Sequence, residues 1–335
     1  MNEWFIYRGD GVQHDDLPAR LPSPPPWRRF EGGELQSAPH GDPDAARGQQ
    51  LAEYIRATTY QASQEEIELI NAALYLRRPL LITGKPGTGK STLAYNVAHE
   101  LKMGRVLYWP ITSRSTRAEG LYQYDAIARL QDANAGKDSK NADPEDIGRY
   151  IRLGPLGTAL LPRKIPQVLL IDELDKSDID LPNDLLSIFE DGGYEIPELA
   201  RISDKKRTAE VLTFHGESKV VIADGLVQCY EFPLVVITSN GERDFPPAFL
   251  RRCLRLHIEI PDRDRLTAIV RAHLGQDAAD DCAEMIDIFV NRRSRGGLAT
   301  DQLLNAIYLM FNRAWPEGRD RLIDNVLHYI DQIAD

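Results

Sequence analysis

The stretch LLITGKPGTGKST, residues 80–92, decides the fold class of this 335-residue chain. Its apolar opening is typical of a buried strand, and it passes directly into a glycine-rich loop. Residues 84–91 of that loop have the eight-residue spacing of a phosphate-binding loop, which joins a strand to a helix. The alternative is a glycine-rich turn without a ligand, but the apolar strand before it and the helical pattern after it favour phosphate binding.

The residue types in this loop suit the phosphates of a nucleotide. Glycines let successive backbone N–H groups approach phosphate oxygens, and the positive end of the following helix faces the same oxygens. Lys90 adds a positive charge at the terminal phosphates, and Ser91 offers a hydroxyl to Mg²⁺. The predicted nucleotide-binding residues are Gly84, Pro86, Gly87, Thr88, Gly89, Lys90, Ser91 and Thr92.

A second apolar strand ends in acidic residues, in VLLIDELDKS at 168–177. Asp172 is predicted to hold Mg²⁺ together with Ser91, and Glu173 to orient and polarise the attacking water. Hydrolysing ATPases commonly carry this second acid, whereas GTPases and small-molecule kinases need not. The alternative is a pair of surface carboxylates that cap a strand. Beside an intact phosphate loop, we predict ATP hydrolysis with Mg²⁺.

A third apolar strand, LVVITSN at 234–240, ends in hydrogen-bonding side chains. We predict that Asn240 positions the attacking water or senses the γ-phosphate. An ordinary Asn-Gly turn is the alternative.

A pair of arginines, Arg251 and Arg252, follows in FPPAFLRRCLRL at 245–256. An arginine delivered to the nucleotide of a neighbouring subunit neutralises charge in the transition state, so hydrolysis would depend on oligomerisation. A solvated surface pair is the alternative. The position of the pair, shortly after the polar strand end, favours the catalytic role.

The composition is that of a soluble protein, with 42% hydrophobic and 27% charged residues. The formal net charge of −11 gives no support for nucleic-acid binding by bulk charge. Three widely spaced cysteines suggest neither a disulfide framework nor a metal site. No segment is apolar for the ~18 residues that a membrane span needs, and the N-terminus lacks the apolar run of a secretion signal. We therefore expect a cytoplasmic location.

Short apolar strands alternate with helical patterns up to Pro261, which predicts a parallel sheet between helical layers. The polar stretch 131–147 is predicted to be a loop or insertion. We expect three parts: a Pro-rich arm (1–60), an α/β core (61–260) and a helical domain (261–335). Aromatic residues in the arm predict that it docks on its own core or on a neighbouring subunit. The strands are expected at 79–83, 106–110, 168–172, 234–240 and 254–260.

The motifs GKPGTGKS, LLIDELDKS, VITSN and FPPAFLRRC occur in this order. Over residues 60–335 the chain resembles the AAA+ ATPases, and most closely their MoxR-like branch. The finer matches are GLYQYD followed by YIRLGPLGTALL, the DELDKS stretch, and EVLTFHGESKVVIADGLVQCYEF, which looks like the β-hairpin ahead of the polar strand. The resemblance implies a P-loop AAA+ core, with a helical insert and that hairpin, and a C-terminal all-helical lid.

The resemblance also implies a homo-oligomer, a hexameric ring with ATP at the subunit interfaces. Lys90 and Ser91 would bind phosphate and Mg²⁺, Asp172 and Glu173 would hold metal and activate water, and Asn240 would be the sensor. Arg252 matches the finger arginine, with Arg251 as the second candidate. The chain departs from the family's pattern at two positions. Cys253 stands where the family has an aromatic residue after the finger arginine. Thr300 lies near the expected position of a lid arginine, for which Arg295 is a substitute candidate.

Three functions remain open at this point. The first is an ATP-driven chaperone that remodels or assembles a protein partner. The family implies von Willebrand factor A domain proteins as partners, some of them in bacterial conflict systems. The second is a nucleic-acid motor, which the acidic net charge and the single lysine at the hairpin tip, Lys219, disfavour. The third is an ATP-gated scaffold or switch, which the intact Glu173 disfavours.

Overall fold

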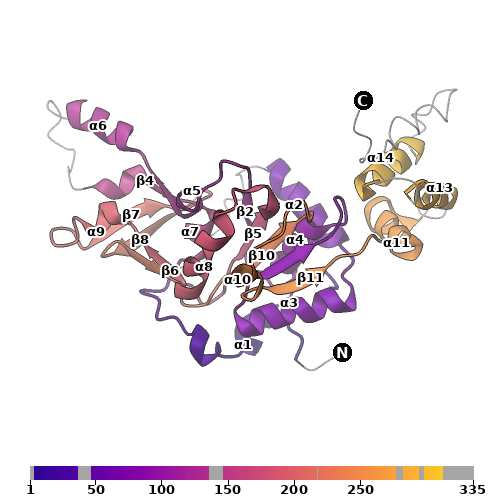
Figure 1. Cartoon of the computed structure of the whole chain (residues 1–335), viewed down its shortest axis with the longest axis horizontal. Helices are drawn as coiled ribbons and strands as arrows, with labels where there is room; N and C mark the ends of the chain where they lie inside the picture. The colour runs from indigo at the N-terminus through magenta and orange to yellow at the C-terminus, as the bar shows by residue number, and fades with distance from the viewer. Residues whose placement is uncertain are drawn as a thin grey trace.

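A parallel sheet of five strands forms the centre of the molecule, in the order β11-β1-β10-β5-β2 (Figure 1). This computed structural model describes residues 4–36, 47–135, 146–216, 218–276, 282–293 and 298–311. Each neighbouring pair of strands in the sheet is parallel, so the predicted α/β class is confirmed. The strands are β1 (Leu80–Thr83), β2 (Leu107–Pro110), β5 (Val168–Asp172), β10 (Leu234–Ser239) and β11 (Leu254–His257).

Both faces of the sheet are covered at its three central strands, β1, β10 and β5, which are buried along nearly their whole length, whereas the edge strands β2 and β11 also carry exposed residues. In β5, Val168 and Leu170 belong to one hydrophobic core and Leu169 and Ile171 to the other, as the alternation of a strand requires. The helices are α2 (Arg47–Thr59), α3 (Gln64–Leu76) and α4 (Lys90–Glu100) on the first face, and α5 (Arg117–Leu121), α7 (Pro155–Ala159), α8 (Leu181–Asp191) and α10 (Pro247–Leu250) on the second.

Two predicted segment boundaries were wrong. The strand expected at 254–260 ends at His257, because its partner β1 ends at Thr83 and the chain turns away at Gly84, where φ is 155°. Of the stretch expected to be a loop or insertion, 131–147, the described ends are helical, and residues 136–145 lie outside the described residues. A helix, α6 (Ala126–Ala135), continues through its alanine-rich end, and a 3₁₀ turn, η2 (Ile147–Tyr150), closes the stretch.

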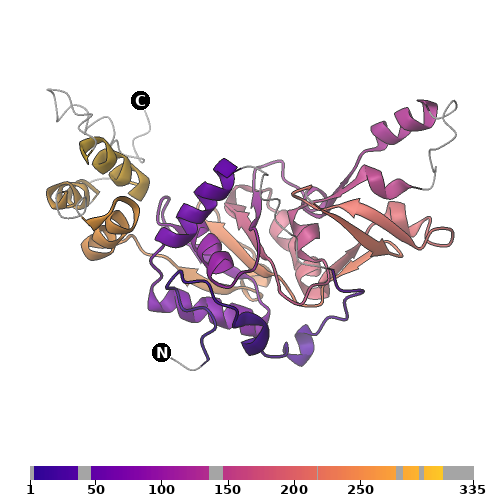
Figure 2. The same cartoon turned by 180° about the vertical axis from the view of Figure 1, so that it is seen from behind.

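The N-terminal arm packs against the core of its own chain, which is one of the two docking surfaces that the sequence left open. Ile6 and Tyr7 are completely buried beside α3 and α4, and Leu17 joins the same core. The side chain of Asn71 accepts the N–H groups of Ile6 and Tyr7 and donates to the carbonyl of Tyr7. The arm then runs beneath the sheet (Figure 2) through two short turns. These are α1 (Leu17–Arg20) and η1 (Pro26–Arg28).

The end of the region expected to be Pro-rich arm is helical instead. Helix α2 lies against α4, and its Ala57 is part of the same hydrophobic core as Val168 and Leu170 of β5. The carbonyl of Ala57 accepts a hydrogen bond of 2.6 Å from Asn96 of α4. The three-part division of the chain stays a prediction.

A second, smaller sheet extends from one end of the molecule, in the order β3-β4-β7-β8 (Figure 1). The hairpin expected before the polar strand is present, since β7 and β8 are antiparallel and pair Leu212 with Lys219 next to the tip. The elements of this region are β3 (Tyr122–Tyr124), β4 (Ile151–Leu153), β6 (Gly193–Glu195), α9 (Pro197–Ala200), β7 (Thr208–Leu212), β8 (Lys219–Ala223) and β9 (Leu226–Gln228).

Helices at the opposite end form the C-terminal region with a separate hydrophobic core (Figure 1). They are α11 (Arg263–Leu274), α13 (Ala283–Arg293) and α14 (Thr300–Phe311). In the described parts of the chain, no helix is both long and apolar enough to cross a membrane.

We predict that Asn71→Ala destabilises the fold by roughly 2–4 kcal/mol, because two buried N–H groups of the arm lose their acceptor. Chemical denaturation followed by circular dichroism measures the free energy of unfolding. Glu68→Ala, an exposed position on the same helix, is the control and should change it by less than about 0.5 kcal/mol. Equal stabilities of the two variants would show that the hydrogen bonds between Asn71 and the arm do not stabilise the fold.

Candidate active site

The phosphate loop connects β1 to α4, as the sequence predicts. Three of its glycines lie where a side chain would be crowded. A Cβ at Gly84 would lie 2.5 Å from the carbonyl oxygen of Ile258. A Cβ at Gly87, where φ is 75°, would lie 2.5 Å from the Cβ of Ala299, and one at Gly89 would lie 3.0 Å from the ring of Tyr60. Gly89 is the N-cap of α4 in a left-handed conformation, so the helix begins at Lys90 and its first N–H groups face the loop.

The other loop residues follow this geometry. Gly84 is buried where β1 ends, and Pro86 is exposed at the tip of the loop. The hydroxyl of Thr88 donates to the carbonyl of Lys85 over 3.0 Å, which tightens the loop. Thr92 lies half-buried in the first turn of α4, directly after Ser91.

The ammonium group of Lys90 is buried and fully hydrogen-bonded. It donates to the carbonyls of Gly84 and Lys85 over 2.8 and 2.9 Å, and to the side-chain oxygen of Asn240 over 2.8 Å. Burial lowers the pKa of Lys90, whereas nearby carboxylates, that of Asp172 first among them, oppose the shift. All three N–H donors of this ammonium are used within the chain, so a phosphate oxygen would take the place of at least one of these acceptors.

Asp172, at the end of β5, contacts Ser91 in the first turn of α4. The hydroxyl of Ser91 donates to Oδ1 of Asp172 over 2.6 Å, and the hydroxyl of Thr238 donates to the same oxygen over 2.7 Å. The hydroxyl of Tyr108, on β2, donates to Oδ2 over 3.3 Å. Burial and this carboxylate raise the pKa of Tyr108 to about 12, so the phenol remains a donor.

These donors fit a magnesium ion. Mg²⁺ prefers oxygen ligands and is held by one or two protein groups together with substrate phosphates and water. The hydroxyl of Ser91 and the carboxylate of Asp172 are such a pair and lie beside the phosphate loop. Among the described residues no three His, Cys, Asp or Glu side chains form a metal cluster, which a magnesium site of this type does not require.

Glu173 has a left-handed backbone, with φ 60° and ψ 49°, directly after β5. Its N–H donates to the hydroxyl of Thr238 over 2.8 Å. Its carboxylate accepts a bond of 3.1 Å from the amide of Asn240 and one of 2.7 Å from the ammonium of Lys176. A non-glycine residue in this conformation requires support from its surroundings, and Thr238 provides part of that support.

Asn240 therefore joins the two halves of the site. Its Oδ1 accepts from Lys90 and its Nδ2 donates to Glu173. The alternative of an inert Asn-Gly turn does not account for these two contacts. Of the predicted residues, the structure brings together Lys90, Ser91, Asp172, Glu173 and Asn240.

The two arginines lie apart from this cluster, at the end of α10. Arg252 is half-buried, forms an ion pair with Glu190 of α8 and donates to the carbonyl of Ala248 over 3.1 Å. Arg251 is exposed. The side-chain contacts of Arg252 are thus with α8 and α10, whereas the carbonyl of Arg251 accepts a bond of 3.4 Å from Arg78.

The C-terminal helices contact the phosphate loop directly. Ala299 and Thr300, at the start of α14, face Gly87. The N–H of Ala299 donates to the side chain of Gln302 over 2.9 Å. Thr300 thus lies beside the loop at the helix start where a lid arginine was expected. The substitute candidate, Arg295, lies outside the described residues.

Sequence reasoning gave no role to two residues that complete the site. Thr238 was visible as part of the polar strand end, but only the structure shows that its hydroxyl bridges Asp172 and the backbone of Glu173. Tyr108 carried no signal in the sequence, because an aromatic residue in a strand is ordinarily a packing residue.

We predict that Thr238→Val destabilises the fold by about 1–3 kcal/mol, because the N–H of Glu173 loses its acceptor. Thermal and chemical denaturation measure the change. Thr238→Ser keeps the hydroxyl and should lose less than half as much stability. If valine and serine are equally tolerated, the hydroxyl does not hold the two acidic residues in place.

Comparison with known proteins agrees with this geometry. The model of the AAA domain family, dynein-related subfamily, matches residues 79–253. The matched segment starts just before β1 and ends just before β11, so it contains the phosphate loop, both acidic residues, Asn240 and the arginine pair. No curated protein matches the chain. Because the match covers just over half of the chain and includes this whole constellation, the protein belongs to the AAA domain family, in its dynein-related subfamily.

Proposed function

We propose that this protein hydrolyses ATP to ADP and phosphate, with Mg²⁺, as a MoxR-like member of the AAA+ ATPases. One observation carries the proposal: Asn240 contacts both the lysine of the phosphate loop and the glutamate after the second acidic strand. A structural turn has no need to join these two groups. A hydrolytic site needs both, because one binds the phosphate and the other activates the water that attacks it.

The residues would divide the work as follows. The backbone N–H groups of the loop and the ammonium of Lys90 would bind the phosphates and offset their charge. Ser91 and Asp172 would hold Mg²⁺, which supplies positive charge at the phosphate oxygens. Glu173 would orient and polarise the attacking water, and Asn240 would position that water relative to the γ-phosphate.

Assembly into a ring, which we propose to be a hexamer, would complete each site. Within this subunit Arg252 is held by Glu190 and by the carbonyl of Ala248, so in the proposed ring it would act on the nucleotide of a neighbouring copy. Arg252 is the first candidate by its position in the motif. Arg251 is the more exposed of the two and remains the second candidate.

The proposed client is a protein, which the ring would remodel or assemble. The resemblance to MoxR-like ATPases supports this role, with a von Willebrand factor A domain protein as the proposed type of partner, in a bacterial conflict system for example. The hairpin of β7 and β8 supports the same branch assignment.

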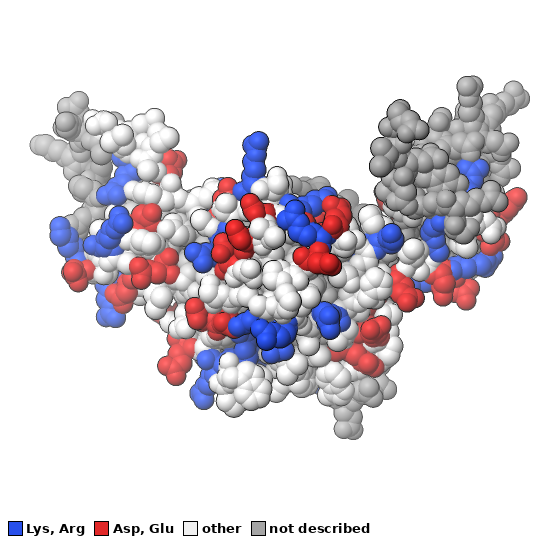
Figure 3. Space-filling model, in the orientation of Figure 1, with Lys and Arg blue, Asp and Glu red and all other residues white. Residues whose placement is uncertain are grey.

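A nucleic-acid motor is the less favoured alternative. Basic residues around the hairpin are paired with acidic ones: Arg207 with Asp224, and Lys219 with Glu210. On the face shown in Figure 3, basic and acidic side chains are intermixed. Such a surface does not form the basic stripe that binds a phosphate backbone. An ATP-gated scaffold or switch is the other alternative, which the intact Glu173 in contact with Asn240 disfavours.

We predict that Glu173→Gln binds ATP with an affinity close to that of the wild type but loses at least about 100-fold in kcat, because the amide cannot polarise water as the carboxylate does. Lys90→Ala should instead lose ATP binding. Fluorescent-nucleotide titration and phosphate release separate the two effects. Full hydrolysis by Glu173→Gln would refute the role of this residue.

Affinity purification of Glu173→Gln in the presence of ATP distinguishes the proposed functions. A bound protein supports the remodeller, and bound nucleic acid supports the motor.

We also predict that mixtures of Arg252→Ala and Glu173→Gln subunits regain activity that neither variant has alone. In randomly mixed rings of equal parts, about one quarter of the interfaces combine an intact glutamate with an intact arginine. Steady-state hydrolysis measures the recovery, and mass spectrometry verifies mixing. The same experiment with Arg251→Ala identifies which arginine acts. Absence of recovery in verified mixed rings, for both arginines, would exclude an arginine supplied by the neighbour.

A further inference from the structure

Asp175 is a buried carboxylate for which the proposed chemistry has no use. It lies two residues after Glu173, in the 3₁₀ turn η3 (Leu174–Lys176), and is only 4% exposed. Burial of a carboxylate is unfavourable unless hydrogen bonds compensate it. Its Oδ2 accepts two backbone N–H groups, that of Asn240 over 2.9 Å and that of Glu242 over 3.0 Å.

These two bonds hold the turn that follows β10. Gly241 lies between the two donors with φ 80°, and both Gly241 and Glu242 are exposed. An exposed turn around a glycine is flexible unless other groups anchor it. The carboxylate of Asp175 is such an anchor, since it binds the turn on both sides of the glycine.

The anchored residue is the one whose side chain spans the site. The N–H of Asn240 is bound to Asp175, while its amide reaches Lys90 in one direction and Glu173 in the other. Both side-chain contacts depend on where the backbone of Asn240 is held. Asp175 therefore sets, through the backbone, the position of a group that contacts both halves of the site.

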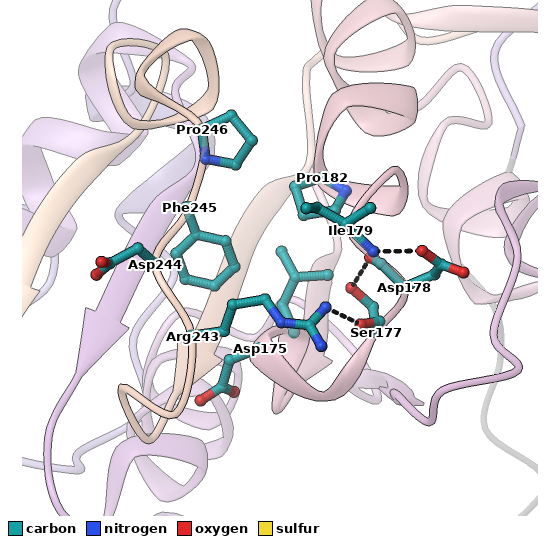
Figure 4. Close-up of a pocket in the computed structure, with 10 residues that line it drawn as sticks. Asp175, Ser177, Asp178, Ile179, Pro182, Arg243, Asp244, Phe245 and Pro246 are labelled. Atoms are coloured by element: carbon teal, nitrogen blue, oxygen red, sulfur yellow. Dashed lines mark hydrogen bonds between the residues drawn. The ribbon is translucent and has the colours of Figure 1, made fainter.

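Figure 4 shows the surroundings of this anchor. A pocket of about 230 Å³ separates the segment after η3 from the segment after the turn, with Ile179 and Pro182 on one side and Phe245 on the other. Arg243 crosses between the segments and donates to the carbonyl of Ser177 over 2.8 Å. Arg243 thus links the segment after η3 to the segment after the turn, and this link does not include Asn240.

We propose that Asp175 is a positioning residue for hydrolysis, which holds the backbone of Asn240 so that its side chain reaches Lys90 and Glu173. This inference rests on the proposed ATPase function. Arg243 makes the second link between the same segments without contact to Asn240, so it is the matched control. The hydrogen-bond acceptor at residue 175, rather than its charge, carries the effect.

The first test is steady-state kinetics. Asp175→Ala should lower kcat roughly 10- to 100-fold, because a small displacement of a positioning group costs that much, while the Kd for a fluorescent ATP analogue changes less than about threefold. Asp175→Asn retains an oxygen acceptor and should keep kcat within about threefold of the wild type. Arg243→Gln should also keep kcat within about threefold of the wild type. Equal losses in Asp175→Ala and Arg243→Gln would mean that Asp175 only joins the two segments, and would overturn the proposal.

A double-mutant cycle with Asn240→Ala tests the route of the effect. If Asp175 acts through Asn240, adding Asp175→Ala to Asn240→Ala lowers kcat no further. Additive losses overturn this inference and leave the proposed function standing. If Asn240→Ala alone keeps full activity, the proposed role of Asn240 is wrong and the inference fails with it.

A measurement on the unmodified protein covers the case in which Asp175→Ala does not fold. Amide hydrogen exchange of the wild type should show slow exchange at Asn240 and Glu242, although the turn is exposed, because both N–H groups are bound to Asp175. Arg243→Gln should leave this protection unchanged. Rapid exchange of both amides in the wild type would show that the carboxylate does not hold the turn.

Discussion

The site depends on one constraint: the ammonium of Lys90 is buried, and a buried charge requires acceptors on all its sides. Two acceptors come from the phosphate loop itself, and the third, Asn240, comes from another strand. Asn240 reaches the lysine because β10 lies directly beside β1 in the sheet. The strand order is thus a condition for satisfying this charge, and the same order places β5, with its two acidic residues, on the other side of β10.

Hydrogen bonds then connect the strand ends into one network. Thr238 binds the side chain of Asp172 and the backbone of Glu173, and Asn240 binds Glu173 and Lys90. A network with so few alternative partners holds its members in a single arrangement, which suits a site that must align water with a phosphate. The layers on both sides of the sheet, with the N-terminal arm buried in one of them, keep the strands that carry these groups in register.

The arginines show what a single subunit lacks. Arg252 is held by Glu190, so its guanidinium is oriented within its own subunit but away from its own phosphate loop. In the proposed ring, a site completed by a second copy would make hydrolysis sensitive to assembly, and a client that changes the spacing of subunits would change the rate. The contact of α14 with Gly87 gives the C-terminal helices access to the same loop. In the proposed ring, both features would connect a bound nucleotide to the subunit interface and to the C-terminal helices.

The sequence by itself determined the α/β class and predicted the residues that the structure brings together, because each motif is local: glycines, a lysine and a serine at fixed spacing, and polar residues at strand ends. It also indicated the hairpin and the helical C-terminal region. It could not assign roles to Thr238, Tyr108 or Asp175, because their partners lie more than sixty residues away in the chain. It assigned residues 131–135, which are helical, to a loop or insertion and left α2 inside the arm, since short polar helices are formed by packing as much as by propensity. Only the tertiary structure decided which strand ends meet, and hydrogen bonds between those ends turn separate motifs into one site.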